Sequence, residues 1–319
     1  MDASDLHLDG VRAAAARIRG VVHQTPVATC STLDRLAGRR LFFKCEHLQK
    51  AGAFKFRGAA HAIATLPAEQ AKHGVVTHSS GNHAGALALA ARLRGIPAHI
   101  VMPRTASAIK QRAVAEYGGR ILLCEPTQAA REATAAQVMA ETGATLVHPY
   151  DDARVILGQG TALLELLEQV EGLEAVIVPV GGGGLAGGTC LAAEAARPAP
   201  RIFAAEPAGA DDAARSFAAG TRLPQPGPNT IADGLLTSLG QLTWPILHRR
   251  LAEVITVSDT EIVAAMRLAW ERAKLLIEPS AATVLAAVLG QRFRSLDGLS
   301  RVGLILSGGN VDLDHLPWR

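Results

Sequence analysis

Short apolar runs alternate with helix-like segments along most of this chain, and this alternation limits the fold more than any other feature. Residues 74–78 form one such run, followed by a polar turn and an alanine-rich helical segment that ends at Arg94. Similar pairs recur as far as the apolar run at 302–306. Strands that alternate with helices predict parallel sheets with helices packed on both faces. The strands that we expect lie at 41–45, 74–78, 98–102, 120–124, 144–148, 175–180, 201–205 and 302–306.

The alternation falls into two runs, which predicts an α/β fold made of two doubly wound parallel-sheet lobes. We expect residues 68–149 to form a small domain that is inserted in the sequence of a large domain, residues 1–67 and 150–319. A cleft should separate the two. Ligands of parallel sheets gather beyond the carboxyl ends of the strands, so the turns after the strands are where we look for a site.

Composition narrows the classes of function. Hydrophobic residues make up 49% of the 319 residues, which is typical of a globular chain. A net charge of +3 with dispersed arginines disfavours nucleic acid as a partner. No apolar run approaches the roughly 20 residues that span a membrane, and the first residues lack the pattern of a secretory signal. Cys30, Cys45, Cys124 and Cys190 show no metal or redox spacing, so we expect reduced thiols and a cytoplasmic protein.

Lys55 is an unusual residue for its position, because it lies between Phe54 and Phe56 just past a glycine turn. Burial disfavours a charged ammonium and lowers its pKa. A neutral amine held in place is what Schiff-base chemistry with a carbonyl requires. The alternative is a lysine that extends its charged end past the two rings into water.

Four consecutive glycines, 181–184, follow the strand at 175–180 and precede a helical segment. Their backbone N–H groups could point into one concavity at the positive end of the helix, which is typical of a phosphate site. A tight turn would explain one or two of the glycines. A second alternative is a nucleotide-binding module, because Gly182, Gly184 and Gly187 match a dinucleotide fingerprint and Glu206 ends the next strand.

Two further strand ends carry polar turns, at residues 79–83 and 307–310. Their serine and asparagine side chains could bind a ligand or could simply cap the helix that follows. Glu206, Ala210 and Asp212 could offer oxygen ligands to a divalent cation, although an acidic solvent-exposed loop has the same composition.

As a set, these motifs resemble those of the pyridoxal-phosphate-dependent serine/threonine dehydratases and serine racemases, which have a tryptophan-synthase-β-like fold (fold type II). The matching stretches are 50–59, 79–83, 181–184 and 307–310, and the likeness runs from about Thr25 to the C-terminus. It includes residues 231–234, 243–246 and 277–279, while Ala53 stands where many members have serine. The resemblance implies a cofactor in the cleft between the lobes and a homodimer.

The resemblance also implies roles for individual residues. Lys55 would form the Schiff base with pyridoxal 5'-phosphate, and Phe54 and Asn82 would hold the cofactor ring. Ser307 would face the pyridine nitrogen, where a hydroxyl makes the ring a weaker electron sink than a carboxylate would. The phosphate would bind to Gly181, Gly182, Gly183 and Gly184, and the substrate carboxylate to Ser79, Ser80, Asn82 and His83.

The activity that the resemblance implies is that of an ammonia-lyase. Lys55 would remove the Cα proton as a general base, the β-hydroxyl would leave, and the product would decay to a 2-oxo acid and ammonia. The expected substrates are L-threonine, L-serine or a related β-hydroxy amino acid such as 3-hydroxyaspartate. Serine racemase is the alternative, with Ser80 exchanging a proton on the opposite face.

Two accessory sites follow from the racemase-like members. Their divalent-cation site, for magnesium, calcium or manganese, matches Glu206, Ala210 and Asp212. In those members a nucleotide effector can bind between subunits, and the corresponding positions here are Lys50, Tyr117, Lys274 and Asn310.

Overall fold

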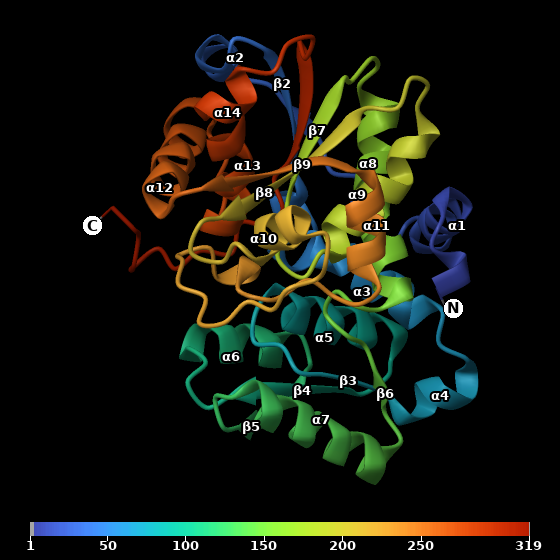
Figure 1. Cartoon of the computed structure of the whole chain (residues 1–319). Coiled ribbons are helices and arrows are strands. Elements are labelled where there is room, and N and C mark those ends of the chain that lie inside the picture. Colours follow the sequence, from blue (N-terminus) through green and yellow to red (C-terminus); the bar gives the residue numbers. More distant parts are fainter. Residues whose placement is uncertain (1–2, 319) are drawn as a thin grey trace.

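A computed structural model of the protein describes residues 3–318, and within them the chain forms two sheets (Figure 1). The larger sheet has six strands in the order β1-β2-β10-β7-β8-β9, and all neighbours are parallel except β1 and β2. Its strands are β1 (Val27–Ala28), β2 (Arg40–Lys44), β7 (Ala175–Pro179), β8 (Arg201–Pro207), β9 (Leu251–Val257) and β10 (Arg301–Ile305). The smaller sheet has four parallel strands in the order β5-β4-β3-β6. These strands are β3 (Val75–Thr77), β4 (Ala98–Pro103), β5 (Arg120–Cys124) and β6 (Thr145–Leu146).

Helices cover both faces of the larger sheet because alternate residues of its strands point to opposite faces. Ile177 and Phe203 belong to the core that packs under one helical layer, whereas Val176 and Ala204 belong to the core under the other. The first layer contains α2 (Ser31–Ala37), α12 (Asp259–Leu268) and α13 (Pro279–Leu289). The second contains α1 (Leu8–Ile18), α8 (Ala153–Gln169), α9 (Gly184–Ala192) and α11 (Thr243–Arg250).

The smaller sheet is built in the same way. Ile100 and Met102 of β4 pack under a layer formed by α3 (Lys55–Ala64), α5 (Asn82–Arg94) and α6 (Ala108–Glu116). Val101 faces the opposite side, under α7 (Gln128–Thr142). In Figure 1, α5 lies on the side of the smaller sheet that faces the rest of the molecule. The predicted α/β class, with two parallel-sheet units, is therefore confirmed.

Some elements differ from the expected pattern. The structure adds β9, α13, α4 (Ala68–His73), α10 (Asp212–Ala219) and α14 (Gln291–Arg294) to those that the alternation predicts. The helix α12 ends at Leu268, and a π-helical turn then leads to Lys274, whose φ of 59° stops the helix. Because all four strands of the smaller sheet fall within residues 68–149, we propose this segment as the small domain and residues 1–67 and 150–319 as the large one.

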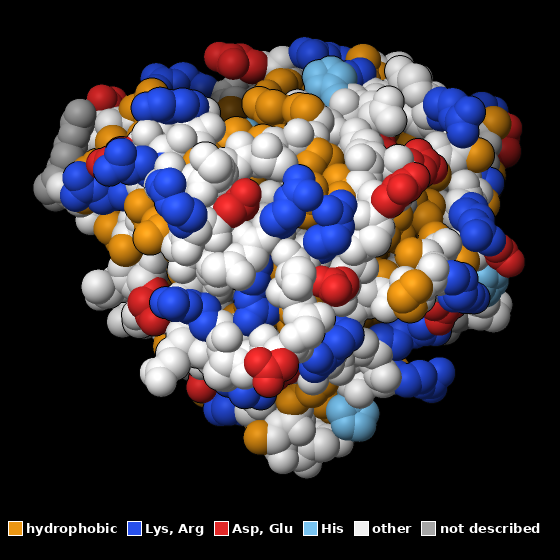
Figure 2. Space-filling view, turned by 90° about the horizontal axis from the view of Figure 1, so that it is seen from above, with side chains coloured by type: hydrophobic (Ala, Val, Ile, Leu, Met, Phe, Trp, Pro, Cys, Tyr) orange, Lys and Arg blue, Asp and Glu red, His pale blue; other side chains and the backbone are white. Residues whose placement is uncertain are grey.

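The surface carries charges of both signs. On the face shown in Figure 2, Lys and Arg side chains are scattered among Asp and Glu side chains. Among the described residues, no helix is both long enough and apolar enough to span a membrane.

Candidate active site

Lys55 is the first residue of α3, and its amine points to the junction of the two units. Its Nζ donates a hydrogen bond of 2.7 Å to the carbonyl oxygen of Pro149 and lies 5.1 Å from the centre of the Phe54 ring. Burial lowers the pKa of Lys55 to about 8, and the nearby Glu278 carboxylate opposes that shift. The amine therefore ends at a protein carbonyl instead of extending into bulk water.

A buried ionic network fixes the first turn of α3. Arg57 donates to both carboxylate oxygens of Glu46, at 2.7 and 2.8 Å, and to both oxygens of Glu165, also at 2.7 and 2.8 Å. Lys44 donates to Glu165 at 2.8 Å. The guanidinium of Arg57 matches two carboxylates at once, which is the strongest arrangement for such a pair. This network anchors the helix two residues beyond the reactive amine.

The glycine loop connects β7 to α9, and each of its residues has a reason to be glycine. A Cβ on Gly182 would lie 2.3 Å from the Tyr150 ring, and one on Gly181 would lie 2.9 Å from the Cα of Leu235. Gly183 has a φ of +90°, which side chains rarely adopt. Gly184 lies against the backbone of Tyr150, which a Cβ would approach to 3.0 Å. Packing and turn geometry therefore account for all four glycines, and not only for the one or two that we expected.

The same loop presents a cradle for an anion. The N–H groups of residues 181–184 donate no hydrogen bond to any described residue, and the last two precede or begin α9. Unpaired backbone donors at a helix N-terminus attract a phosphate or carboxylate. The loop therefore fits the phosphate end of a cofactor.

The turn after β3 brings Asn82 to the start of α5. Asn82 Nδ2 donates to Glu278 Oε1 at 2.8 Å, and Asn82 Oδ1 accepts from Asn310 Nδ2 at 2.9 Å. The hydroxyl of Ser80, which is half-buried, has no hydrogen-bond partner among the described residues, whereas Ser79 Oγ accepts from the backbone N–H of Gly81 at 3.4 Å. A free hydroxyl and an anchored amide thus stand on one short turn.

The turn after β10 lies directly against the lysine segment. The carbonyl oxygen of Ser307 accepts from the backbone N–H of Phe54 at 2.9 Å, and Ala53 forms an isolated antiparallel bridge with Gly308. Ser307 is buried. The structure thus links the lysine segment directly to residues 307–310, and those residues to the turn at 79–83 through Asn310. The glycine loop packs against Tyr150, and the preceding residue, Pro149, accepts the hydrogen bond from Lys55. The loop therefore belongs to the same contact network.

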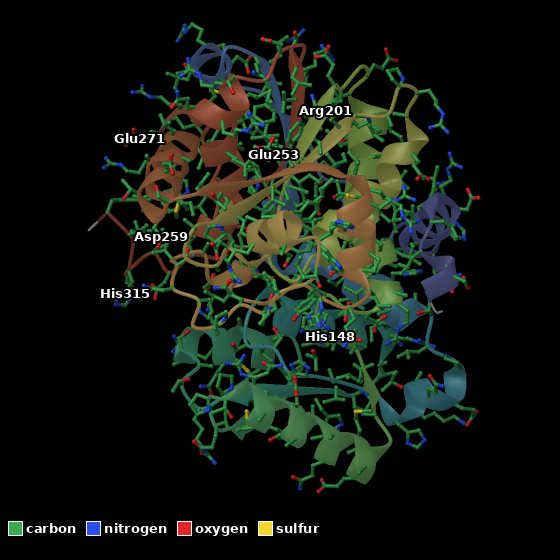
Figure 3. All side chains as sticks on the ribbon, in the orientation of Figure 1. His148, Arg201, Glu253, Asp259, Glu271 and His315 are labelled. Atoms are coloured by element: carbon green, nitrogen blue, oxygen red, sulfur yellow. The ribbon has the colours of Figure 1, made fainter. Side chains whose placement is uncertain are left out.

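His83, which is buried, and His148, which is half-buried, lie near the amine and are held neutral. Burial lowers the pKa of His83 well below its ordinary value, and the charge of Lys55 adds to the shift. His83 Nε2 is 3.2 Å from the carbonyl oxygen of Val147, which can only accept, so Nε2 carries the proton and the buried Nδ1 is without a partner among the described residues. Burial lowers the pKa of His148 to about 4, and this residue lies between the two sheets (Figure 3).

Three residues of this region were given no role from the sequence: His148, Tyr150 and Glu278, the last of which lies in the matching stretch 277–279. Glu278 follows no expected strand and precedes a helix that the alternation does not predict. Tyr150 stacks edge-on against His148, with 4.6 Å between ring centres, and packs on Gly182. No local pattern identifies such residues, because their importance depends on long-range contacts.

Glu206 lies near the end of β8 in the larger sheet, Ala210 lies in the turn that follows, and Asp212 begins α10. The Glu206 carboxylate accepts from the backbone N–H groups of Ala213 and Ala214 at 2.9 and 3.0 Å and so caps α10. Asp212 Oδ2 accepts from Leu239 N at 2.8 Å, while its buried Oδ1 has no partner among the described residues. Burial raises the pKa of Glu206 to about 8 and that of Asp212 to about 6. A Glu206 carboxylate buried against helix N–H groups does not favour the nucleotide-binding alternative, in which it would meet a ribose.

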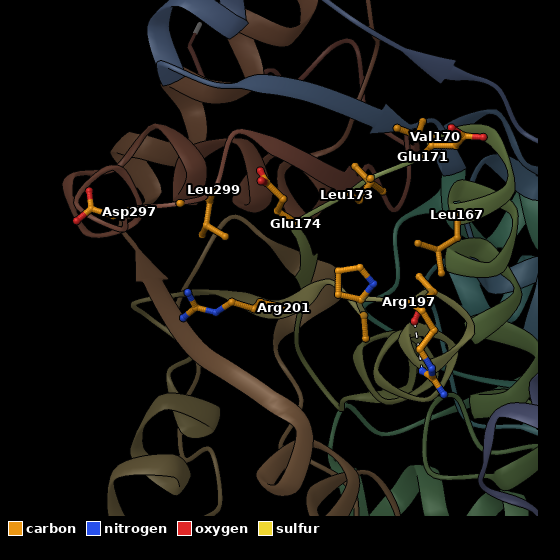
Figure 4. A pocket seen from close by; sticks show the side chains of 14 residues that line it. Leu167, Val170, Glu171, Leu173, Glu174, Arg197, Arg201, Asp297 and Leu299 are labelled. Carbon is orange, nitrogen blue, oxygen red and sulfur yellow. Dashed lines mark hydrogen bonds between the residues drawn. The ribbon is translucent and has the colours of Figure 1, made fainter.

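A separate surface cavity of about 320 Å³ lies away from these residues (Figure 4). It is lined by the loops around Glu171, Arg197 and Asp297 and contains none of the predicted site residues. We place the candidate site at the converging strand ends and not in this cavity, because the reactive amine, the free N–H groups and the perturbed pKa values are found there.

Comparisons with known proteins show the family to which the chain belongs. Residues 18–308 match the family model described as pyridoxal-phosphate dependent enzyme. A serine racemase of Arabidopsis thaliana is 52% identical over 309 residues, covering 96% of this chain and 93% of that protein. A beta-hydroxyaspartate dehydratase of Paracoccus denitrificans is 52% identical over 306 residues, covering 96% of both chains. The crystal structure of serine racemase from Dictyostelium discoideum superposes with a TM-score of 0.93 at 49% identity, covering 97% of this chain and all of the other.

Proposed function

This chain belongs to the pyridoxal-phosphate-dependent enzymes, and from that premise we propose that it is an ammonia-lyase acting on β-hydroxy amino acids. The substrates would be L-threonine, L-serine or 3-hydroxyaspartate, and the products a 2-oxo acid and ammonia. The observation that carries the proposal is the amine of Lys55, whose pKa is lowered to about 8, in one contact network with a loop of unpaired backbone donors. The 52% identity to a beta-hydroxyaspartate dehydratase supports it.

The residues present fit the cofactor, because the backbone N–H groups of the glycine loop have no partner among the described residues and stand at the N-terminus of α9, where an anion is favoured. We assign its phosphate to Gly181, Gly182, Gly183 and Gly184, its ring to Phe54 and Asn82, its pyridine nitrogen to Ser307, and its aldehyde to Lys55. When bound, pyridoxal phosphate supplies an electron sink for the charge that develops at the substrate Cα.

Lys55 is the group that we propose to move the proton. In its neutral form, Nζ can accept the Cα proton, and a pKa of about 8 places that form within reach of neutral pH. Ser79, Ser80, Asn82 and His83 would hold the substrate carboxylate, His83 through its backbone N–H, because its only ring proton faces Val147. The turn at 79–83 ends at the N-terminus of α5, which favours an anion. Because His83 is neutral, it places no positive charge beside Lys55 that would oppose protonation of the amine.

Racemisation of serine is the second candidate, and one feature favours it. Ser80 has a half-buried hydroxyl with no partner within residues 3–318, and such a group is available to exchange a proton from the face opposite Lys55. Proteins named serine racemase are 52% and 50% identical to this chain over nearly its whole length.

A divalent cation is part of the proposal. Asp212 Oδ1 is buried without a partner in the part of the chain that the structure describes, and Glu206 is a second buried carboxylate close by. The carbonyl oxygen of Ala210 would complete a set of hard oxygen ligands, which suits magnesium, calcium or manganese. A cation would offset the cost of burying two carboxylates together.

We further propose a cytoplasmic homodimer. The four cysteines are free thiols, as expected in a reducing compartment. Leu48, Leu276 and Leu313 are each about half exposed, and exposed leucines of this kind are typical of a surface that a partner covers. Leu276 and His47, the residue before Leu48, both border Gly309. A nucleotide effector would bind at such an interface through Lys50, Tyr117, Lys274 and Asn310.

The test is a substrate panel. The purified protein, saturated with pyridoxal phosphate, is given L-threonine, 3-hydroxyaspartate and both enantiomers of serine, with and without magnesium. Formation of 2-oxo acid and the enantiomer ratio of remaining serine are measured together. We expect 2-oxo acid from at least one substrate. Absence of both 2-oxo acid and enantiomer exchange in every sample would rule out the proposed function.

A further inference from the structure

The orientation of the Asn82 amide can be deduced from the chain of contacts around it. Asn310 Nδ2 donates to the carbonyl oxygen of Ala51 at 2.9 Å, and because that oxygen can only accept, the orientation of the Asn310 amide is determined. The same Nδ2 is 2.9 Å from Asn82, so the atom of Asn82 that it meets must be the acceptor Oδ1. The Nδ2 of Asn82 therefore faces the carboxylate of Glu278, at 2.8 Å.

Glu278 is the centre of this arrangement. Its second oxygen accepts from the backbone N–H of Asn310 at 3.1 Å, and its own N–H donates to the carbonyl oxygen of Gly308 at 3.0 Å. The side chain is buried, with 4% of the residue exposed, and it packs so closely that a Cβ on Gly308 would lie 2.5 Å from Oε1. One carboxylate thus joins the turn of the smaller unit to the turn after β10.

The donors around Glu278 require an acceptor at both of its oxygens. A backbone N–H cannot change its role, so Oε2 must accept from Asn310. Asn82 Nδ2 then keeps one N–H on Glu278 Oε1, and its second N–H has no partner among the described residues. An amide held in this way can offer a ligand only a donor, and it can do so without reorienting.

The charges near Glu278 are of both signs. The Glu278 carboxylate lies close enough to Lys55 to favour its charged form. Asp233 repels the carboxylate, and Lys110 attracts it. Lys110 and Asp233 themselves form an ion pair of 2.7 Å across the two units. Burial and Asp233 raise the pKa of Glu278 to about 8, while the hydrogen bonds from Asn310 and Asn82 oppose the shift.

We propose that Glu278 is a positioning residue that acts through Asn82: it holds the amide with its nitrogen toward the site, so that Asn82 presents a hydrogen-bond donor to an oxygen of the bound cofactor. This inference rests on the proposed function, because it assigns Asn82 to the cofactor. It explains why a carboxylate is buried at this point, where an apolar side chain would leave two donors unpaired.

The test is a titration of the apoprotein with pyridoxal phosphate, followed by the visible absorbance of the bound cofactor. Glu278→Gln keeps the shape but offers one acceptor and one donor. The backbone N–H of Asn310 takes the acceptor, so the new NH₂ group faces Asn82 and turns its amide. We expect the Kd for pyridoxal phosphate to rise about 10- to 100-fold, as for one misoriented buried hydrogen bond, and the absorbance band to shift. Glu271→Gln, which removes an exposed carboxylate, is the matched control and should bind as the parent does.

A double-mutant cycle separates positioning from a structural effect. In the Asn82→Ala background, Glu278→Gln should change the Kd by less than about twofold, because the residue through which it acts is gone. The proposal would be overturned if Glu278→Gln raised the Kd of the Asn82→Ala protein by the same factor as that of the parent. An unchanged Kd and absorbance band in the single variant Glu278→Gln would also overturn it. If Glu278→Gln does not fold, Asn310→Ala removes the donor to Asn82 Oδ1 from an exposed side chain, and we expect a Kd raised about 3- to 10-fold. An unaltered Kd there would equally overturn it.

The outcomes also separate this inference from the proposed function. A parent protein that binds pyridoxal phosphate but makes no 2-oxo acid or enantiomer exchange refutes the function, while the Kd comparison still decides the role of Glu278. Turnover in the parent with an unchanged Kd in Glu278→Gln refutes the inference alone.

Discussion

At the scale of single residues, the site depends on how burial changes proton affinity. Lys55 loses part of its hydration at the junction of the two units, and the low-dielectric surroundings disfavour its charged form. Burial shifts the pKa of Glu278 in the opposite direction, upward, while the N–H donors of Asn310 and Asn82 favour the ionised carboxylate. Opposed shifts in neighbouring groups are typical of active sites that transfer protons.

The first prediction concerns the pH dependence of cofactor capture. Only a neutral amine attacks an aldehyde, and a lowered pKa increases the neutral fraction at a given pH. The rate at which the apoprotein captures pyridoxal phosphate should therefore rise with pH and level off above about pH 8. A free lysine analogue measured in parallel should keep rising to about pH 10. A protein profile that follows the analogue would show that burial does not tune this amine.

The second prediction concerns Ser80. Ser80→Ala removes the unpaired hydroxyl and should lower interconversion of L- and D-serine by about 100-fold or more, the usual contribution of a general acid or base. Formation of 2-oxo acid should fall by less than about 10-fold, because Lys55 still removes the Cα proton. Chiral chromatography and 2-oxo acid assays on the same samples measure both. Equal losses in the two reactions would argue against a separate role for Ser80.

The residues that sequence analysis selected share one property: they stand in compact motifs at strand ends. Lys55, Asn82, Ser307 and the glycine loop could be selected because of where the strands end. Tyr150 could not, because it acts through a contact more than 30 positions away in the chain. Glu278 lies in the matching stretch 277–279 but could be given no role, because its partner Asn82 is 196 positions away.

At the scale of elements, the glycine loop shows how packing constrains a binding loop. At each of the four positions a side chain would collide with a neighbouring residue or would require an unfavourable φ angle. The loop backbone therefore packs closely on its neighbours, and its N–H groups remain free for a ligand. The same steric requirement serves both fold and site.

The third prediction tests that requirement. Gly182→Ala would place a methyl group 2.3 Å from the Tyr150 ring, so we expect a loss of about 1–3 kcal/mol in the free energy of unfolding and a weakened Kd for pyridoxal phosphate. Gly187→Ala is the matched control: its Cβ would make ordinary contacts at 3.7 and 3.8 Å inside α9, where alanine favours the helix. Urea unfolding and cofactor titration measure both variants. A Gly182→Ala protein as stable as the parent would contradict the steric account.

The fourth prediction concerns the loop between β8 and α10. Magnesium should raise the Tm of the parent protein, because a cation that binds only the folded state stabilises it. Asp212→Asn removes one of the proposed ligands and should abolish the increase. Thermal unfolding with and without magnesium, followed by addition of a chelator, makes the measurement. An equal increase in both proteins would place the cation elsewhere.

Elements that alternate regularly were predicted well, and those that break the alternation were not. β5 begins and ends as expected, because its apolar run is bounded by a glycine pair and a proline. β9 was missed because its burial pattern is irregular, with four half-buried and exposed positions before its first buried one. α13 was missed because almost every residue in it is buried, which removes the helical periodicity that sequence analysis uses.

At the scale of the whole molecule, two covered sheets place their strand ends at one junction. The lysine segment follows β2, residues 307–310 follow β10, and the glycine loop follows β7, which are neighbours in the larger sheet. The turn after β3 reaches the same point from the smaller sheet through Asn82. Parallel strands make this convergence automatic, and the class of fold could be predicted from the alternation alone.

The central claim is that Lys55 is the residue that carries the cofactor, and reductive trapping tests it most directly. The protein is incubated with pyridoxal phosphate, reduced with borohydride, digested and analysed by mass spectrometry. We predict that a phosphopyridoxyl group is found on the peptide that contains Lys55 and that Lys55→Ala prevents this labelling. Labelling of another lysine instead, or full 2-oxo acid formation by Lys55→Ala, would contradict the account.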